Sequence, residues 1–311
     1  PSQHNAIPAW QLGANGTGIT LAIIDSGLDT TNPEFTGRIS SASADVAGNR
    51  GLINADSNHG TQVALTAAAA RNGSGIEGIA WNATIQALRV DSPGTCPNTD
   101  GCSFLDPDIS NAIDRAVAAG AKVINLSMGG SPPNQTLIAA VARAATAGVA
   151  IVVSAGNDGA TSPQQPDAFA SGLRQAGNGN VIIAGSVDSS GVISSFSNQA
   201  GSESAWFLSA LGEKICCVYE NGQIKVTTDN TGQQFVTVVS GTSYAAPQIS
   251  GALTLLRQYF PNLTAAQAVD LLLKTATDAG ATGTDAVYGR GILNIGAAFA
   301  PQGATALAGN G

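Results

Sequence analysis

The stretch Leu21-Ala22-Ile23-Ile24-Asp25-Ser26-Gly27 decides the class of fold, because an apolar run passes directly into an aspartate and a turn. A short run without polar alternation is typical of a strand buried on both faces of a parallel sheet. Comparable runs predict further strands, and together with the first they span residues 19–24, 85–90, 122–126, 149–154 and 181–184. We therefore expect a mainly parallel sheet whose strands end in polar residues.

Helical patterns alternate with these strands. Apolar residues recur at helical spacing over residues 60–71, 108–119 and 135–147, and glycines at positions 73, 120 and 148 provide stop signals. Two further helices are predicted over residues 243–260 and 265–275, and an antiparallel hairpin is predicted around Asn221-Gly222. This alternation predicts an α/β fold of three layers, in which helices cover both faces of the sheet.

Size and composition indicate one large domain. The chain has 311 residues, of which 43% are hydrophobic and 11% charged, so it can form a sizeable core. We assign residues 1–302 to this domain and residues 303–311, which are small and polar, to a C-terminal linker or tail. The beginning of the chain lacks a charged and apolar signal segment, so we expect a mature or trimmed protein.

Charge and hydropathy argue against two classes of partner. The formal net charge is -8 with 13 Lys and Arg residues, whereas a nucleic-acid surface needs clustered basic residues. No apolar run approaches the roughly 20 residues that span a bilayer. We expect no nucleic-acid binding and no membrane insertion by this chain.

The four cysteines form two pairs along the sequence. Cys96 and Cys102 flank a short polar loop that a disulfide would close, which indicates an oxidising compartment. Cys216 and Cys217 are adjacent, and most disulfides join Cα atoms that lie farther apart than neighbours do. For these two we favour the reduced form, packed as small apolar side chains, over a strained vicinal bond.

Polar residues at strand ends are the first candidates for a site, because ligands of open α/β sheets bind beyond the carboxyl ends of the strands. Asp25 ends its strand, although an isolated aspartate there is more often a turn cap. Of the two histidines, we expect His4 to lie in a mobile terminus, which leaves His59 as the usable imidazole base. A lone histidine is more often structural than catalytic, so His59 gains weight only from its partners.

Two further residues complete a candidate site for nucleophilic catalysis. Ser243 stands at a predicted helix start, with Pro247 in the first turn, where the helix dipole and free N–H groups favour developing negative charge. A serine hydroxyl is a weak nucleophile without a base, so His59 must come within hydrogen-bond reach of it. Asn157 follows a buried strand, and its side-chain N–H would complete an oxyanion hole with the Ser243 N–H.

The order Asp, His, Ser along the chain is that of subtilisin. Five blocks resemble the signatures of the subtilase family, in family order: Asp25-Ser26-Gly27, His59-Gly60-Thr61, Ser127-Met128-Gly129-Gly130, Ala155-Gly156-Asn157 and Gly241-Thr242-Ser243. The resemblance extends from about residue 8 to residue 298 and implies a subtilisin-like fold with a seven-stranded sheet. It also implies a monomeric serine endopeptidase that hydrolyses peptide bonds in protein or peptide substrates through an acyl-enzyme.

The same resemblance implies a substrate-binding set. Its first three members would form an edge along which an extended substrate pairs as a strand. The loops that carry the set would wall the pocket for the residue that precedes the cut bond, with the aspartate at the rim. The set comprises Ser127, Met128, Gly129, Ala155, Gly156 and Asp158. An acidic rim favours basic residues, whereas small walls admit large apolar ones, so the cleavage preference stays open.

The end of the chain resembles the close of protease passengers in subtilase autotransporters, over residues 284–294 and 297–301. Ser195-Phe196-Ser197-Asn198 fits the same group. Such passengers precede a membrane β-barrel in the full precursor, which implies that this chain is a released passenger or a truncated form. The resemblance therefore implies a protein that is secreted or at the cell surface of a Gram-negative bacterium.

Two parts of the family pattern are altered or incomplete. Tyr244 occupies the position after the nucleophile that is often methionine. Asn72 and Glu34 resemble two positions of a subtilisin calcium site, but two oxygen donors fall short of the six to eight that calcium takes. We expect no cofactor, with calcium as the alternative that these two positions leave open. The alternative function is a catalytically silent adhesin or binding module on the same scaffold.

Overall fold

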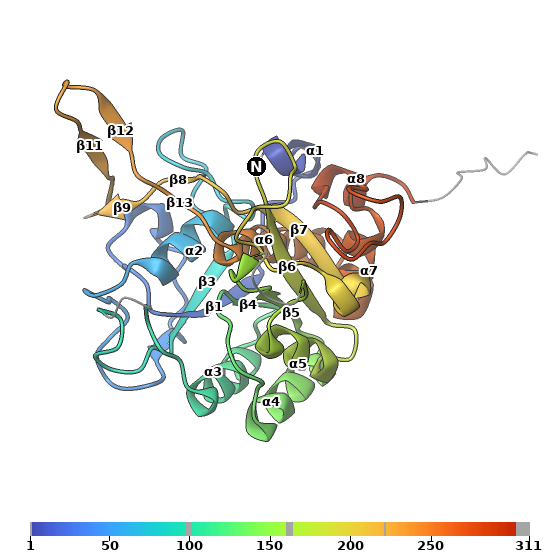
Figure 1. Ribbon diagram of the computed structural model, residues 1–311. Coiled ribbons are helices and arrows are strands. Elements are labelled where there is room, and N and C mark those ends of the chain that lie inside the picture. Colours follow the sequence, from blue (N-terminus) through green and yellow to red (C-terminus); the bar gives the residue numbers. More distant parts are fainter. Residues whose placement is uncertain (1, 98–100, 160–163, 221, 303–311) are drawn as a thin grey trace, which may run out of the picture.

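The fold is built around a seven-stranded sheet (Figure 1). The computed structural model describes residues 2–97, 101–159, 164–220 and 222–302, so the predicted tail at 303–311 lies outside the described residues. The strand order is β2-β3-β1-β4-β5-β6-β7, and all neighbouring strands are parallel. The strands are β1 (Thr20–Asp25), β2 (Ala44–Asp45), β3 (Thr84–Arg89), β4 (Val123–Leu126), β5 (Ala150–Ser154), β6 (Val181–Val187) and β7 (Phe207–Leu211). This confirms the predicted sheet.

Helices cover both faces of the sheet, as Figure 1 shows. Alternate strand residues face opposite layers, so Leu21 and Ile23 of β1 join one apolar cluster and Ala22 and Ile24 join the other. The first layer contains α1 (Ile7–Gln11), α2 (His59–Ala68), α6 (Thr242–Tyr259), α7 (Ala265–Lys274) and α8 (Ile295–Phe299). The second contains α3 (Asp106–Ala118), α4 (Gln135–Thr146) and α5 (Ala168–Ala176). None of the helices within these described ranges combines the length and apolar composition that crossing a membrane requires.

The predicted helices and strands are present, with ends displaced by up to three residues. Two ends differ by three residues: β6 extends to Val187, and α2 stops at Ala68 because Ala69 adopts an extended backbone. The sequence analysis did not predict the strands β2 and β7 or the helices α1, α5 and α8. The short 3-10 helices η1 (Ser2–His4), η2 (Pro33–Phe35) and η4 (Gly201–Trp206) complete the main body.

A set of short antiparallel ribbons projects from the main body (Figure 1). The predicted hairpin is confirmed by pairing of β9 (Tyr219–Glu220) with β10 (Gln223–Ile224), while Asn221 itself lies outside the described residues. A second hairpin pairs β11 (Val226–Thr228) with β12 (Gln234–Val236), and β8 (Ile215–Cys216) pairs with β13 (Val238–Val239) at the base.

Both cysteine pairs are disulfides in this structure. Cys96 and Cys102 are joined, as the sequence predicts. Cys216 and Cys217 are also joined, across a cis peptide bond with their Cα atoms 3.0 Å apart, so the preference for the reduced form was wrong.

The segment around His4 belongs to the core, which corrects the expectation of a mobile terminus. His4 has no exposed surface. Its Nδ1 lies 3.1 Å from the Leu293 carbonyl oxygen, and the Leu211 N–H donates to its Nε2 over 2.9 Å. Leu293 and Leu211 are more than 200 positions away along the chain, so the closing segments of the fold bury the imidazole.

Candidate functional site

Four of the predicted site residues lie on segments that meet at the carboxyl edge of the sheet. Asp25 ends β1, Ser127 follows β4 and Asn157 follows β5, and these three strands are neighbours. Ser243 lies at the start of α6, which packs across the same strands. Because parallel strands end at a common edge, residues that are distant in sequence are brought together there.

Asp25 and His59 form a hydrogen-bonded pair at the start of α2. Asp25 is 1% exposed, and its Oδ1 lies 2.8 Å from the His59 Nδ1. A carboxylate can only accept here, so the His59 Nδ1 carries the hydrogen and Nε2 of the neutral ring is free to act as a base. Gly60 permits this approach, because a Cβ at that position would lie 2.2 Å from the Gly27 carbonyl oxygen.

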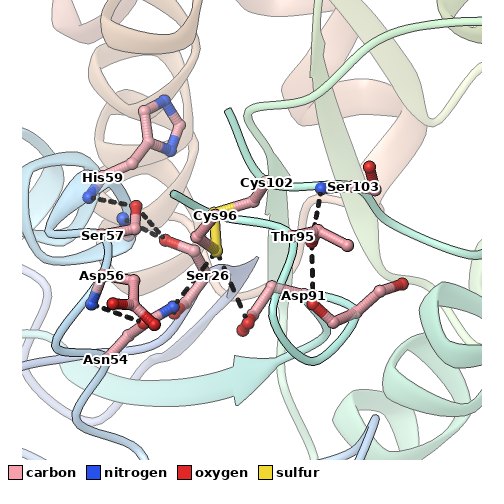
Figure 2. Close-up of a disulfide and its surroundings, with 12 residues drawn as sticks. Ser26, Asn54, Asp56, Ser57, His59, Asp91, Thr95, Cys96, Cys102 and Ser103 are labelled. Atoms are coloured by element: carbon pink, nitrogen blue, oxygen red, sulfur yellow. Dashed lines mark hydrogen bonds between the residues drawn. A yellow bond between two sulfur atoms is a disulfide. The ribbon is translucent and has the colours of Figure 1, made fainter. Parts of the chain in front are cut away.

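Two serines hold the first turn of α2 in place. The Ser57 hydroxyl accepts from the His59 N–H at 3.3 Å, and the Ser26 hydroxyl accepts from the Gly60 N–H at 3.2 Å. Figure 2 shows this arrangement beside the Cys96–Cys102 disulfide. The Asn54 amide connects the turn to the disulfide, because it donates to the Ser26 carbonyl at 2.8 Å and contacts the sulfur of Cys96 at 3.5 Å. The disulfide loop therefore buttresses the turn that positions His59.

The electrostatic environment of His59 raises its pKa above the ordinary 6.5. Burial lowers this pKa, whereas the Asp25 charge and the hydrogen bond to Asp25 raise it, and the carboxylate prevails. About a third of the side chain, 32%, remains exposed. The imidazole is thus reachable, and Asp25 stabilises its protonated form.

Ser243 is held by a reciprocal contact with Ser127. The Ser243 hydroxyl lies 3.4 Å from the Ser127 carbonyl oxygen, and the Ser127 hydroxyl donates to the Ser243 carbonyl at 2.8 Å. Pro247 explains the second bond: it is the sixth residue of α6, not a first-turn residue as predicted, and its missing N–H leaves the Ser243 carbonyl without its helical partner. Ser243 is the second residue of α6, so its own N–H is among the donors that lack an intrahelical acceptor.

The predicted hydrogen bond between His59 and Ser243 is not formed among the described residues, where the Ser243 hydroxyl is directed to Ser127. A single rotation about the serine χ1 re-aims this hydroxyl without moving the backbone. Catalytic hydrogen bonds often tighten only in the substrate complex, so this geometry is compatible with a nucleophile that engages its base on binding.

The Asn157 amide has a fixed orientation. Its Oδ1 accepts from the Thr242 N–H at 2.8 Å and from the Thr242 hydroxyl at 2.9 Å. Because both of these partners are donors, the oxygen must face Thr242 and the NH2 group must face away from it. The sequence analysis named Thr242 only within the Gly241-Thr242-Ser243 block and gave it no role, because its contact with Asn157 forms only when the start of α6 meets the loop after β5.

The predicted substrate-binding residues lie on the two loops that follow β4 and β5. The Ser154 hydroxyl links these loops by donating to the Met128 carbonyl at 3.0 Å. The Met128 side chain is only 6% exposed and belongs to the core, as does Ala155. The Asp158 N–H donates to the Asn198 Oδ1 at 2.8 Å, and Asn198 donates back to the Asp158 carboxylate at 3.1 Å.

Two arrangements near the site were not foreseen. Tyr244 packs on His59 with ring centroids 5.6 Å apart, and its hydroxyl donates to the Gln62 Oε1 at 3.2 Å. Asp167 places its carboxylate between the loops after β4 and β5, where it accepts from the Gly130 N–H at 3.0 Å and caps α5 through the Ala170 N–H at 2.7 Å. A Pro-Asp pair before an apolar helix is the sequence signal that would have indicated the cap.

Glu34 and Asn72 do not fit a calcium site. The Glu34 carboxylate accepts from the Tyr219 hydroxyl at 3.0 Å and from the Asn72 amide at 3.2 Å. Both oxygens therefore face hydrogen-bond donors, which repel a cation. No group of three or more His, Cys, Asp and Glu residues gathers in metal-binding fashion within the portion of the chain that the structure describes.

A parallel sheet covered on both faces brings a serine, an aspartate–histidine pair and an asparagine to one edge, and comparison with known proteins assigns the class of protein. A family model described as "Subtilase family" matches residues 16–291. Subtilisin DY of Bacillus licheniformis is 31% identical over 92% of both chains, and subtilisin E of Bacillus subtilis is 31% identical over 96% of this chain and 70% of its own. The chain therefore belongs to the subtilase family and is a subtilisin-like serine endopeptidase.

Solved structures support the same assignment. The structure of fervidolysin from Fervidobacterium pennivorans, described as a keratinolytic enzyme, has a TM-score of 0.74 and 29% identity over 94% of this chain and 44% of its own. The structure of the MycP3 protease from the type VII (ESX-3) secretion system has a TM-score of 0.70 and 28% identity over 96% of this chain and 87% of its own.

Proposed function

We propose that this chain cleaves peptide bonds within proteins through an acyl-enzyme on Ser243, with His59 as the base, Asp25 as its orienting carboxylate and Asn157 as an oxyanion donor. The 2.8 Å contact between Asp25 and the His59 Nδ1 carries this proposal, because it fixes the tautomer in which Nε2 accepts a proton. A buried aspartate paired with a partly exposed imidazole is the arrangement that general base catalysis requires.

The reaction would proceed in two balanced halves. His59 removes the Ser243 hydroxyl proton while Oγ bonds to the substrate carbonyl carbon, and the C–N bond breaks as His59 returns the proton to the departing amine. Water then takes the place of the amine: His59 removes a proton from water while the water oxygen bonds to the acyl carbon. The ester C–O bond to Ser243 then breaks as His59 returns that proton to the Ser243 Oγ, which releases the carboxylic acid product and restores the free enzyme. Asp25 stays ionised and stabilises the imidazolium in both halves.

The oxyanion that develops in each half would be stabilised by two donors. One is the Ser243 N–H, which lacks an intrahelical acceptor. The other is the Asn157 NH2, which Thr242 turns away from itself by binding the amide oxygen. Donors that are fixed before the charge develops cost no reorganisation, and each contributes about 10²–10³ in rate.

We assign substrate binding to the loops after β4 and β5. Ser127 to Gly129 would pair with an extended substrate, and Ala155 and Gly156 would form the opposite wall around the residue before the cut bond. The link between Ser154 and Met128 supports this assignment, because it holds the two loops in a common frame. Asp158 would lie at the rim of that pocket.

Labelling with a fluorophosphonate tests the proposed nucleophile. We expect one label per folded chain on Ser243 and none in Ser243→Ala. Ser240→Ala is the matched control, since it removes an exposed hydroxyl from the same segment. Folded protein that takes up no label would contradict the proposal and would instead support a silent binding module on this scaffold.

We further propose that the enzyme acts outside the cytoplasm, as an autotransporter passenger of a Gram-negative bacterium and as a monomer that needs no cofactor. Two disulfides within the described residues support an oxidising location. The sequence of residues 284–301 supports the passenger assignment. Locating the protein with an antibody in intact cells, culture medium and lysate tests this setting, and protein confined to the cytoplasm would contradict it.

A further inference from the structure

The Asp167 carboxylate lies between the two loops to which we assign the substrate pocket. Its Oδ2 would be 2.1 Å from a Cβ placed on Gly129 and 3.3 Å from a Cβ placed on Gly156. Only glycine at position 129 leaves room for the carboxylate, so the two loops and this side chain are matched in shape. The Asp167 N–H also donates to the Ala155 carbonyl at 2.9 Å, which ties the start of α5 to the second loop.

Asp158 adds a second acidic group beside the same loops. Asn198 binds both the N–H and the carboxylate of Asp158. The Asn198 amide is itself wedged against Gly156, where a Cβ would lie 2.5 Å from its Nδ2. The Asn198 N–H also donates to the Gly156 carbonyl at 3.1 Å. The Asp158 side chain is thereby held next to the pocket wall.

We propose that Asp167, assisted by Asp158, makes this an acidic pocket that selects arginine or lysine as the residue before the cut bond. The inference rests on the proposed function, which supplies the pocket. Asp167 is a specificity-determining residue in this proposal and takes no part in bond breaking.

The Asp167 carboxylate retains capacity for a cationic partner. A carboxylate has about four acceptor positions, and the Gly130 and Ala170 N–H groups use one on each oxygen. Among the described residues, no Lys or Arg forms an ion pair with Asp167. A substrate guanidinium or ammonium would supply the missing countercharge, and its own desolvation would be offset by charge-assisted hydrogen bonds.

The protonation of Asp167 gives the selection a pH dependence. Burial raises the pKa of Asp167 to about 6; the Ala170, Gly130 and Phe169 N–H groups lower it, and the Asp158 charge raises it. Asn198, which contacts Gly156 and Asp158, is neutral and does not titrate. Asp167 is therefore mostly ionised at pH 8 and mostly neutral at pH 5, so preference for a cation increases through about pH 6.

Matched peptides test this inference. Fluorogenic peptides that differ only by arginine or citrulline before the cleaved bond have the same shape there and differ in charge. We expect kcat/KM for arginine to exceed that for citrulline by about tenfold or more at pH 8, and the ratio to fall as the pH is lowered to 5. Titration of His59 changes kcat/KM for both peptides by the same factor, so it cancels in their ratio.

Asp167→Asn separates the charge from the helix cap. Asparagine already caps α4 and α8 in this protein, through Asn134 and Asn294, so the variant retains a capping oxygen. We expect the arginine to citrulline ratio to approach one in Asp167→Asn. It should stay unchanged in Asp270→Asn, which removes an exposed charge on α7.

The inference and the proposed function fail in different ways. Cleavage of both peptides at equal rates by the unaltered protein, a ratio that does not change with pH, or an Asp167→Asn variant that keeps the preference would each overturn the inference while leaving the protease intact. If the variant does not fold, the pH series on the unaltered protein still decides. Absence of fluorophosphonate labelling would overturn the proposed function instead.

Discussion

The regions around the two histidines, His4 and His59, differ in the group that accepts the hydrogen bond from the imidazole Nδ1. In each ring Nδ1 faces an acceptor, the Leu293 carbonyl for His4 and the Asp25 carboxylate for His59. Both rings therefore carry the hydrogen on Nδ1. In His4 the Nε2 also accepts a hydrogen bond from the Leu211 N–H, so neither ring nitrogen is available to act as a base. Among the described residues, no N–H group occupies the Nε2 of His59 in this way.

Their pKa values move in opposite directions for this reason. Burial lowers the pKa of His4 to about 4, and the Leu293 carbonyl opposes this only in part. Burial also lowers the pKa of His59, but the Asp25 charge and hydrogen bond raise it above 6.5. A full negative charge, rather than a hydrogen bond alone, therefore separates a candidate base from a structural histidine.

The largest expected effect comes from removing that charge. In Asp25→Asn the imidazole loses its orienting acceptor and its countercharge, so we expect kcat to fall about 10⁴-fold on a peptide substrate. The pKa of His59 should also fall, because burial persists without the opposing carboxylate, and the acid limb of kcat/KM should move to lower pH. Steady-state kinetics from pH 5 to 9 measure both effects.

Thermal melting and circular dichroism serve as the control for Asp25→Asn, since a folded variant is needed to interpret the rate. A folded variant that keeps more than a tenth of the activity would show that His59 does not depend on Asp25. The comparison between the two histidines would then lose its physical basis.

The second effect concerns His4 and stability. The unfolded chain binds a proton at His4 below pH 6.5, whereas the folded chain binds it only below about pH 4. Stability should therefore fall as the pH drops from 6.5 to 4, by about 3 kcal/mol in total, and should not depend on His4 above pH 7. Urea unfolding at pH 7.5 and 4.5 measures this difference.

Carboxylates titrate in the same acid range, so the His4 contribution requires a variant. His4→Gln has no titrating ring, and the loss of stability between pH 7.5 and 4.5 should be smaller in it than in the unaltered protein. An equal loss in both proteins would indicate that His4 is protonated in the folded state.

The sequence predicted the interior of the fold and supplied the residues that we propose for the site. Buried strands such as 21–24 are recognisable because unbroken apolar runs have few alternatives, and glycines mark where helices stop. Asp25, His59 and Ser243 could be proposed from the sequence because nucleophilic catalysis restricts the choice of side chains and their order, and their roles stay a prediction.

Features that depend on contacts between residues far apart in the chain could not be predicted from the sequence. His4 is buried by residues more than 200 positions away, and a local pattern carries no trace of them. Asp167 gains its place only where Gly129 and Gly156 converge from separate strands. The Ser127 to Ser243 link depends on Pro247, whose missing N–H matters only after α6 has crossed the sheet.

The smallest expected effect concerns the ring face of His59, which packs against Tyr244. The Tyr244 ring, 7% exposed, covers His59 at a tilt of 54°, and its hydroxyl is tied to Gln62. In Tyr244→Leu we expect kcat to fall about two- to tenfold with KM unchanged, because an aromatic pair contributes about 0.5–1.5 kcal/mol and here positions the base.

Tyr244→Phe keeps the ring and should keep kcat, while the unpaired Gln62 oxygen costs about 1 kcal/mol of stability. Separate values of kcat, KM and unfolding free energy for the two variants distinguish these roles. If Phe slows the reaction as much as Leu, the hydrogen bond to Gln62, not the ring contact, positions His59.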